Sequence, residues 1–434
     1  MAHLGMVELS LILLGVMILL LASGVWIAVA LGLVGFMAMA LTTSLPLGTV
    51  LATTTWSASA SWTLAALPLF IWMGEILFRT KLSESMFRGL APWVSRLPGR
   101  LLHTNVIGCT IFAAVSGSSA ATCATIGKMT LPELARRGYP EEITIGSLAG
   151  AGTLGLLIPP SIIMIVYGVT ADVSIARLFV AGILPGIVLA ALFSGYLAVW
   201  AVMNKKRIPV PDQVLTFGQK VHESRHLIPV VLLIGAVLGS IYSGVATATE
   251  AAAVGVVGSL ILSAVQRSLN WETFRESLLG ATRLYCMIAL ILAGAAFLTL
   301  AMGYIGLPRH LAEFVRSLGL SPFMLMVALS IFYIILGCFL DGISMVVLTM
   351  GVILPTVQAA GFDLIWFGIF IVIVVEMAQI TPPVGFNLFV LQGMTGKEIT
   401  WIARVTLPFF FLMCGMVLLL WFVPQMATWL PSHM

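Results

Sequence analysis

The sequence predicts an all-α polytopic membrane protein made of two inverted repeats. Of its 434 residues, 60% are hydrophobic and only 9% are charged, whereas a soluble domain carries about 25% charged residues. Prolines recur at an offset of 223 residues, which lays Pro132 on Pro355 and the pair Pro159-Pro160 on Pro382-Pro383. The distribution of basic residues then places the two copies in opposite orientations in the membrane.

The composition narrows the possible functions. The mean hydropathy is +1.11, and stretches such as 178–203 are long enough to span about 30 Å of hydrocarbon. The net charge of +4 is small, and the basic residues lie between predicted helices, so we expect no nucleic-acid partner. Histidines and cysteines show no metal-ligand or C-x-x-C spacing. Without a P-loop or paired catalytic residues, we expect no enzyme activity and an ion gradient as the energy source.

Each repeat is predicted to contain about five transmembrane helices and one re-entrant hairpin. In the first repeat, residues 1–203, we expect helices or apolar segments at 4–21, 24–42, 54–80, 81–100 (basic and amphipathic), 101–130, 142–170 (broken) and 178–203. The same offset gives, for the second repeat, residues 227–434, the segments 227–244, 247–265, 277–303, 304–323, 324–353, 365–393 and 401–426. Residues 204–226, rich in basic residues and proline, are expected to form a cytoplasmic linker.

The positive-inside rule orients the two copies. Residues 128–142 contain three Lys or Arg, whereas the matching residues 351–365 contain none. Likewise, residues 79–100 contain five and residues 302–323 contain two. The first segment of each pair is therefore predicted to face the cytoplasm and the second to face outward, with both termini outside.

The predicted sides of the loops agree with the number of membrane crossings only if the segments 101–130 and 324–353 each begin and end on the same side of the membrane. Each is therefore predicted to be a re-entrant hairpin with its tip near mid-membrane. The tips read VSGSS at 115–119 and GCFLDG at 337–342. Glycine, serine and aspartate suit a turn whose backbone opens toward a cavity.

Each tip is expected to face a proline-broken helix and to form a binding site with it. Carbonyls freed by the missing proline N–H can bind Na⁺, and half-helix N-termini attract an anion. The first candidate site joins the tip at Ser116 to residues 150–161, and the second joins 337–342 to 376–387. The alternative is a pair of proline kinks whose serines bond to their own helices. That alternative readily explains one such site, but it does not readily explain two sites related by the same offset of 223 residues.

Four carboxylates lie in apolar sequence, where an ionised side chain costs about 2.5–3.5 kcal/mol or more. Glu250 has the position of a capping-box residue at the start of a helix. Glu75 is spaced to pair with Arg79 at i+4. Asp341 and Glu376 stand beside the second site. They could bind Na⁺, carry protons or simply hold the tip by hydrogen bonds, and the sequence does not choose among these roles.

Five motifs occur in order along essentially the whole chain: VSGSSAATCATIGKMTLPELARRGYP, GTLGLLIPPSIIMIVYG, ATATEAAAVG, LGCFLD and ITPPVGFNLFVLQGMTG. Together they resemble the large membrane subunit (DctM-type) of tripartite ATP-independent periplasmic (TRAP) transporters. The resemblance implies an ion-transporter-superfamily elevator fold in the bacterial inner membrane. It also implies Na⁺-coupled import of a small organic anion, a carboxylate by expectation. A DctP-type periplasmic binding protein would deliver it, and a DctQ-type small membrane subunit would complete the complex.

The resemblance further implies two Na⁺ sites. The first would involve Ala113, Ser116, Gly155, Ile158 and Pro160, and the second Gly337, Ala378, Thr381 and Val384. The chain departs from the family at Ala113, where serine is frequent, and at Ala378, where glycine is usual; the first departure leaves only the carbonyl as a ligand. Polar side chains at the tips and breaks are candidate substrate-facing residues: Ser118, Ser119, Thr122, Ser161, Asp341, Ser344, Gln379 and Asn387.

Elevator transport would divide the chain into a moving part and a fixed part. Residues 101–170 and 324–393 are expected to form the transport domain, and 1–65 and 227–280 the scaffold. Two alternatives stay open at this point. One is a stand-alone ion-coupled carrier of the same superfamily that needs no binding protein. The other is a membrane receptor or scaffold subunit that transports nothing itself.

Overall fold

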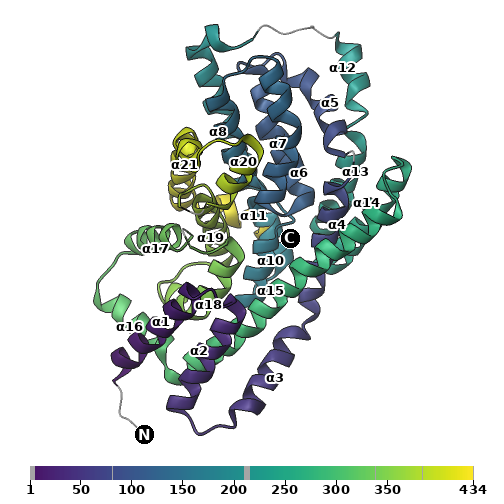
Figure 1. Ribbon diagram of the computed structural model, residues 1–434. Coiled ribbons are helices and arrows are strands. Elements are labelled where there is room, and N and C mark those ends of the chain that lie inside the picture. Colours follow the sequence, from purple (N-terminus) through teal and green to yellow (C-terminus); the bar gives the residue numbers. More distant parts are fainter. Residues whose placement is uncertain (1–4, 81, 210–215, 338, 384, 434) are drawn as a thin grey trace.

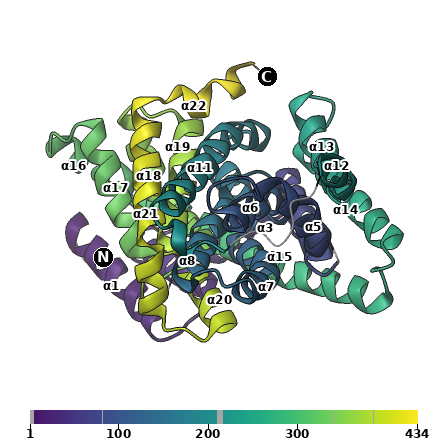
Figure 2. The ribbon, with the colours of Figure 1, turned by 90° about the horizontal axis from the view of Figure 1, so that it is seen from above.

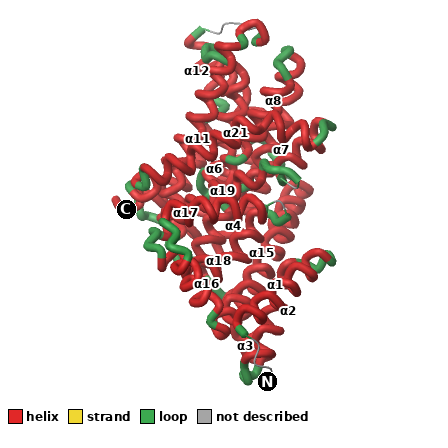
Figure 3. Tube along the Cα trace, turned by 90° about the vertical axis from the view of Figure 1, so that its left-hand side faces the viewer, coloured by secondary structure: helices red, strands yellow, loops and turns green. Residues whose placement is uncertain are grey.

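The computed structural model describes residues 5–80, 82–209, 216–337, 339–383 and 385–433. These residues form helices joined by loops, with no strand anywhere in the described ranges (Figure 3). The prediction of an all-α chain is confirmed.

The first part of the chain forms helices of 13–17 residues. They are α1 (Met6–Ala22), α2 (Ile27–Thr42), α3 (Leu47–Ser59), α4 (Ala66–Phe78) and α5 (Leu82–Val94). The single helix expected over 54–80 is wrong, because α3 ends at Ser59 and a short 3-10 turn, Trp62–Ala65, precedes α4. Serines at 59 and 61 favour the break, since their hydroxyls compete for backbone hydrogen bonds.

A helical hairpin and a broken helix follow. The elements are α6 (His103–Ser116), α7 (Ser119–Arg136), α8 (Glu141–Gly152), α9 (Leu154–Leu157), α10 (Ile162–Thr170) and α11 (Ile175–Met203). The break lies at Pro159-Pro160, where two residues without an N–H end α9. The axes on either side are bent by 40°.

The linker between the halves contains a helix that the sequence did not indicate. This helix, α12 (Phe217–Ser224), lies against α5 in both Figure 1 and Figure 2. The indole Nε1 of Trp93 donates to the Ser224 hydroxyl at 2.7 Å, and the same ring meets Phe217 edge-on. The linker is therefore attached to the amphipathic helix α5.

The second half repeats the order of elements seen in the first. Its helices are α13 (Ile228–Tyr242), α14 (Ala248–Val265), α15 (Trp271–Ile305), α16 (Leu307–Ser317), α17 (Pro322–Leu336), α18 (Gly342–Ala359), α19 (Leu364–Gln379), α20 (Phe386–Thr395), α21 (Ile399–Phe422) and α22 (Gln425–Thr428). A hairpin, α17–α18, again precedes a helix interrupted at a proline pair, between α19 and α20. That the two halves are inverted with respect to the membrane stays a prediction.

Close backbone contacts join α2, α4, α14 and α15 into one packed unit, which Figure 1 shows around the long diagonal α15. A Cβ added to Gly294 would lie 2.5 Å from the Ala28 carbonyl oxygen, and one added to Gly35 would lie 3.0 Å from the Phe297 ring. A Cβ at Gly255 would lie 2.5 Å from the Met73 sulfur. Small residues at such crossings are typical of helix packing in membranes.

Length and composition fit a multi-pass membrane protein. Within the described residues, five helices are long and apolar enough to cross a membrane, or up to seven if each of two bent pairs counts as one span. Shorter apolar helices include α1, α2, α4, α17 and α19. Large apolar side chains such as Leu232, Ile261 and Phe411 are exposed on the helix surfaces, as contact with lipid requires.

Candidate functional site: two hairpin tips at two helix breaks

The first tip is a tight, polar turn. Helix α6 ends at Ser116, and Gly117 adopts φ +60° while its N–H donates to the Ala113 carbonyl at 3.2 Å. Ser118 then caps α7 by accepting from the Ala121 N–H at 3.4 Å. The hydroxyls of Ser116 and Thr122 lie 2.6 Å apart across the turn. Glycine is required at 117, because other residues rarely adopt this backbone conformation.

This tip touches the first helix break directly. The Ile162 N–H donates to the Gly117 carbonyl at 3.3 Å. A Cβ added to Gly155 would lie 2.6 Å from the Ser118 carbonyl oxygen, so α9 and the tip are in backbone contact. Ser161 caps α10 by accepting from the Met164 N–H at 3.3 Å. The tip therefore lies beside Gly155 and the Pro159-Pro160 break, which also contains Ile158.

The second tip packs on the second break in a similar way. Asp341 caps α18 by accepting from the N–H groups of Ile343 at 3.1 Å and Ser344 at 3.3 Å, and from the Ser344 hydroxyl. Gly337 lies so close to Ala378 of α19 that a Cβ would overlap it. Asp341 thus holds the tip by hydrogen bonds, and its roles in binding Na⁺ or carrying protons stay predictions. Val384 lies outside the described residues.

The donor sets suit a hard cation that prefers oxygen. At the first break, Pro159 has no N–H to donate to the Gly155 carbonyl four residues earlier, and the Ser116 hydroxyl lies nearby on the tip. At the second, the Thr381 hydroxyl donates to the carbonyls of Met377 at 3.0 Å and Ala378 at 2.9 Å. That hydroxyl oxygen keeps lone pairs for an ion. Oxygen atoms of the kind that Na⁺ prefers are therefore present at both breaks.

The two sites are linked by Glu376, which is 1% exposed. It lies on α19 near the second break, yet its Oε1 accepts from the Ser119 hydroxyl and from the Leu156 N–H at 3.1 Å. Both donors belong to the first site. Its second oxygen, Oε2, is buried without a hydrogen-bond partner.

A second buried polar group near these elements comes from α20. Asn387 is 0% exposed, and neither its amide oxygen nor its nitrogen has a hydrogen-bond partner. A Cβ added to Gly152 of α8 would lie 3.4 Å from the Asn387 Nδ2 and 3.0 Å from the Cβ of Cys123 on α7. Cys123 and Gly152 lie about one helical turn from Ser119 and Leu156 respectively. Two buried polar groups with unpaired atoms therefore lie against α7 and α8–α9. Gln379 lies beside the second tip, since a Cβ at Gly342 would be 3.1 Å from its Nε2.

The two carboxylates with predicted local partners have them. Glu250 accepts from the Thr247 N–H at 2.8 Å in a capping box, and Glu75 pairs with Arg79 at 3.3 Å. The bridge from Glu376 to Ser119 was not predicted, because it joins residues 257 positions apart. The only signal in the sequence was an acidic residue at the end of an otherwise apolar helix.

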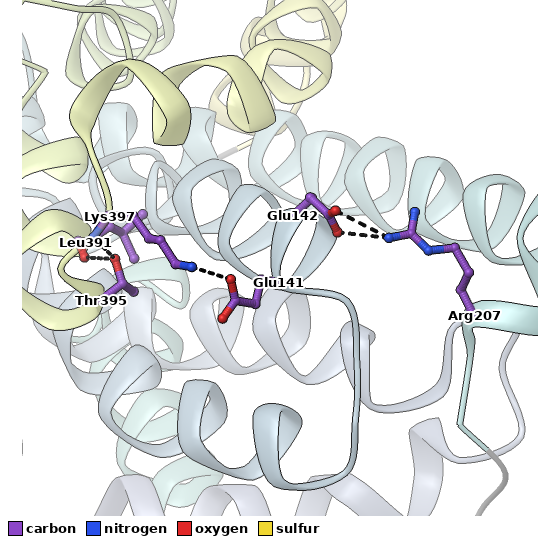
Figure 4. Close-up of polar contacts among 6 residues, drawn as sticks. All are labelled: Glu141, Glu142, Arg207, Leu391, Thr395 and Lys397. Carbon is purple, nitrogen blue, oxygen red and sulfur yellow. Dashed lines mark hydrogen bonds and ion pairs between the residues drawn. The ribbon is translucent and has the colours of Figure 1, made fainter.

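Two ion pairs hold the start of α8, at the end predicted to be cytoplasmic (Figure 4). The Glu141 carboxylate lies 2.5 Å from the Lys397 Nζ, in the loop between α20 and α21. The Glu142 carboxylate lies 3.1 Å from the Arg207 guanidinium, just after α11. Neighbouring carboxylates therefore attach the first broken helix to the second half on one side and to the linker on the other.

Comparison with solved structures gives the class of the fold. The chain is similar to the YdaH transporter of Alcanivorax borkumensis, with a TM-score of 0.65 and 14% identity, over 96% of this chain and 99% of that one. At this identity the likeness concerns the fold alone. The two proteins share one all-helical fold.

Sequence comparison gives the family. The model of the family "Tripartite ATP-independent periplasmic transporter, DctM component" matches residues 14–426. The C4-dicarboxylate TRAP transporter large permease protein DctM of Rhodobacter capsulatus is 31% identical over 98% of this chain and 99% of its own length. The isethionate TRAP transporter permease protein DctMQ of Oleidesulfovibrio alaskensis is 32% identical over 95% of this chain and 65% of its own length. The chain therefore belongs to the DctM family of TRAP transporter large permeases, as its motifs predicted.

Proposed function

We propose that this protein is the membrane permease of a Na⁺-coupled secondary transporter that imports a small organic anion, a carboxylate by preference. The observation that carries the proposal is the pair of hairpin tips, each in contact with a proline-broken helix. Relatives named for C4-dicarboxylate and isethionate transport support an anionic substrate.

In this proposal each element of the site has a distinct role. Backbone carbonyls at the breaks and the hydroxyls of Ser116 and Thr381 bind the coupling ions. The N-terminal end of α7, at the first tip, offers partial positive charge to the anion. Hydroxyl and amide side chains such as Thr122, Gln379 and Asn387 then orient it. Na⁺ favours the anion because its charge offsets part of the cost of bringing a carboxylate into the membrane.

Transport is proposed to follow an elevator mechanism. The tips and breaks form one compact polar centre, which is cheaper to move whole than to open on both sides in place. The hairpins α6–α7 and α17–α18 with their broken helices would move against the unit of α2, α4, α14 and α15. We further propose an inner-membrane location, a DctQ-type small membrane subunit and a DctP-type periplasmic binding protein that selects the substrate.

Uptake in proteoliposomes tests this function. The protein would be reconstituted with a small subunit and a binding protein sought among its neighbouring genes, using a ligand identified by screening that binding protein. An inward Na⁺ gradient should drive accumulation, and a Na⁺ ionophore should abolish it. Accumulation without Na⁺, or without the binding protein, would instead favour a different coupling ion or a stand-alone carrier.

A further inference from the structure

Glu376 is the only described side chain that hydrogen-bonds from the second helix break to both parts of the first site. Its Oε1 accepts from Ser119, the first residue of α7 after the tip, and from the N–H of Leu156 in α9. Glu376 itself lies two residues before Ala378 and five before Thr381. One carboxylate oxygen therefore holds the tip and the break of the first site from the helix that carries the second.

The electrostatic surroundings stabilise this acceptor. The carboxylate lies at the N-terminal end of the 18-residue helix α7, where the helix dipole contributes partial positive charge. Two hydrogen bonds are made to the same oxygen, Oε1. They satisfy one oxygen of a carboxyl group that is 1% exposed and leave Oε2 without a partner.

The two donors lie on elements that are in direct contact with each other. The Gly155 Cα lies too close to Ser118 for a Cβ to fit, and the Ile162 N–H bonds to the Gly117 carbonyl. A change in the position of the tip is thus passed to α9 and, through Glu376, to α19. An ion that orders either site removes part of the ordering cost at the other.

We propose that Glu376 is a positioning residue that makes Na⁺ binding at the two sites cooperative. It binds no ion itself and acts through its hydrogen bonds to Ser119 and Leu156. The inference rests on the proposed Na⁺ coupling and adds to it a specific link between the two sites.

The test measures Na⁺ cooperativity in two ways. Uptake by proteoliposomes gives a Hill coefficient, and the thermal unfolding of purified protein as a function of Na⁺ gives a second reading that needs no transport. Two sites limit the wild-type Hill coefficient to about 2. Glu376→Ala should lower it toward about 1, since each site then fills independently. Glu376→Gln keeps an acceptor oxygen at the same place and should stay near the wild-type value.

Two further variants show whether a change in the Hill coefficient comes from the hydrogen bonds of Glu376. Ser119→Ala removes one of the two donors and should give an intermediate Hill coefficient, even if Glu376→Ala does not fold. Glu250→Gln is the matched control, because Glu250 lies in an exposed capping box on α14 that glutamine also satisfies. It should leave cooperativity unchanged.

The possible failures are distinguishable. A wild-type protein that shows no Na⁺ dependence contradicts the proposed function. A cooperative wild type with an unchanged Hill coefficient in both Glu376→Ala and Ser119→Ala overturns the link between the sites and leaves the function standing. Loss of cooperativity in Glu376→Gln as severe as in Glu376→Ala also overturns it, because charge rather than a hydrogen-bond acceptor would then be the requirement.

Discussion

The Thr381 hydroxyl donates its proton to its own helix, so only its oxygen lone pairs face an ion. Thr381→Val keeps the shape but removes the oxygen, whereas Thr381→Ser keeps the oxygen. A lost ligand of this kind should cost about 1–3 kcal/mol, so Thr381→Val should raise the half-saturating Na⁺ concentration about 5- to 150-fold. Na⁺ titration of uptake measures this. Equal activation curves for the valine and serine variants would exclude Thr381 as a ligand.

Replacing Asn387 should change stability and transport activity in opposite directions. Its amide is fully buried with no partner, which is unfavourable for folding by about 1–3 kcal/mol. Asn387→Leu should therefore raise the unfolding temperature in the absence of substrate while lowering uptake, because an orienting group is lost.

The control for this variant is Asn105, an equally buried asparagine whose Nδ2 donates to the Thr144 carbonyl at 3.0 Å and the Ser147 hydroxyl at 2.9 Å. Asn105→Leu should lower the unfolding temperature. If both variants are destabilised alike, the Asn387 amide has a structural partner and does not await a ligand.

Contacts between residues close in the sequence could be predicted, whereas contacts between residues far apart in the sequence could not. The Thr247–Glu250 capping box and the Glu75–Arg79 pair lie within one helical turn, so their spacing alone predicts them. The contact between Glu376 and Ser119, and the approach of Asn387 to Gly152, depend on how α19 and α20 pack against α7 and α8. Periodicity and spacing carry no information on that packing.

At the scale of elements, the contact between α9 and the first tip allows no added atom at residue 155. Gly155→Ala places a Cβ 2.6 Å from the Ser118 carbonyl oxygen, so the backbone of the tip must shift. We expect a loss of about 1–3 kcal/mol in stability, as for overpacked cores, and weaker Na⁺ activation. Thermal unfolding with and without Na⁺ measures both effects.

The comparison variant is Gly195→Ala on the exposed side of α11, where nothing lies within 4 Å of the added Cβ. Alanine loses less backbone conformational entropy than glycine when it enters a helix, so Gly195→Ala should be neutral or stabilise the protein by up to about 1 kcal/mol. A Gly155→Ala protein as stable and as active as Gly195→Ala would show that the tip and α9 are not in fixed contact.

Helix ends were predicted well where a proline pair or a Gly-Ser turn marks them in the sequence. Proline pairs mark both helix breaks, and the Gly-Ser tip separates α6 from α7 within two residues of the expected turn. The split between α3 and α4 was missed, because Ser59 and Ser61 are weak breakers compared with proline. Helix α12 was missed because its short amphipathic sequence is stabilised by packing on α5.

At the scale of the whole molecule, the elevator proposal requires α18 to slide past α15. The Cβ of a residue at 351 would lie 2.9 Å from the Cβ of Thr299, and a disulfide needs about 3.5–4.5 Å. A shift of under roughly 1 Å therefore lets Thr299→Cys and Gly351→Cys bond. Oxidation of this pair should stop uptake, and reduction should restore it.

The matched pair lies inside the proposed moving part. A Cβ at Gly152 would be 3.0 Å from that of native Cys123, so Gly152→Cys can bond to it with a similar small shift. Uptake by this variant should be the same before and after oxidation. Full uptake with the 299–351 bond closed would replace the elevator by a mechanism with a fixed site.

The inverted topology predicts opposite exposure of the two hairpin bases. Ala135 at the end of α7 and Ala359 at the end of α18 are both exposed. In a cysteine-free background, an impermeant thiol reagent applied to intact cells should label Ala359→Cys and should label Ala135→Cys only after lysis. Labelling of both from the same side would contradict inverted repeats.

The paired carboxylates at the start of α8 also make the protein sensitive to ionic strength. The Glu141–Lys397 and Glu142–Arg207 pairs are partly exposed, and the Debye length falls from about 10 Å at 0.1 M salt to about 3 Å at 1 M. Any salt, including potassium or choline chloride, should therefore weaken these two ion pairs. Under the proposed Na⁺ coupling, sodium would act both as a specific ligand and as a nonspecific electrolyte, and the two actions would separate only when total ionic strength is held constant.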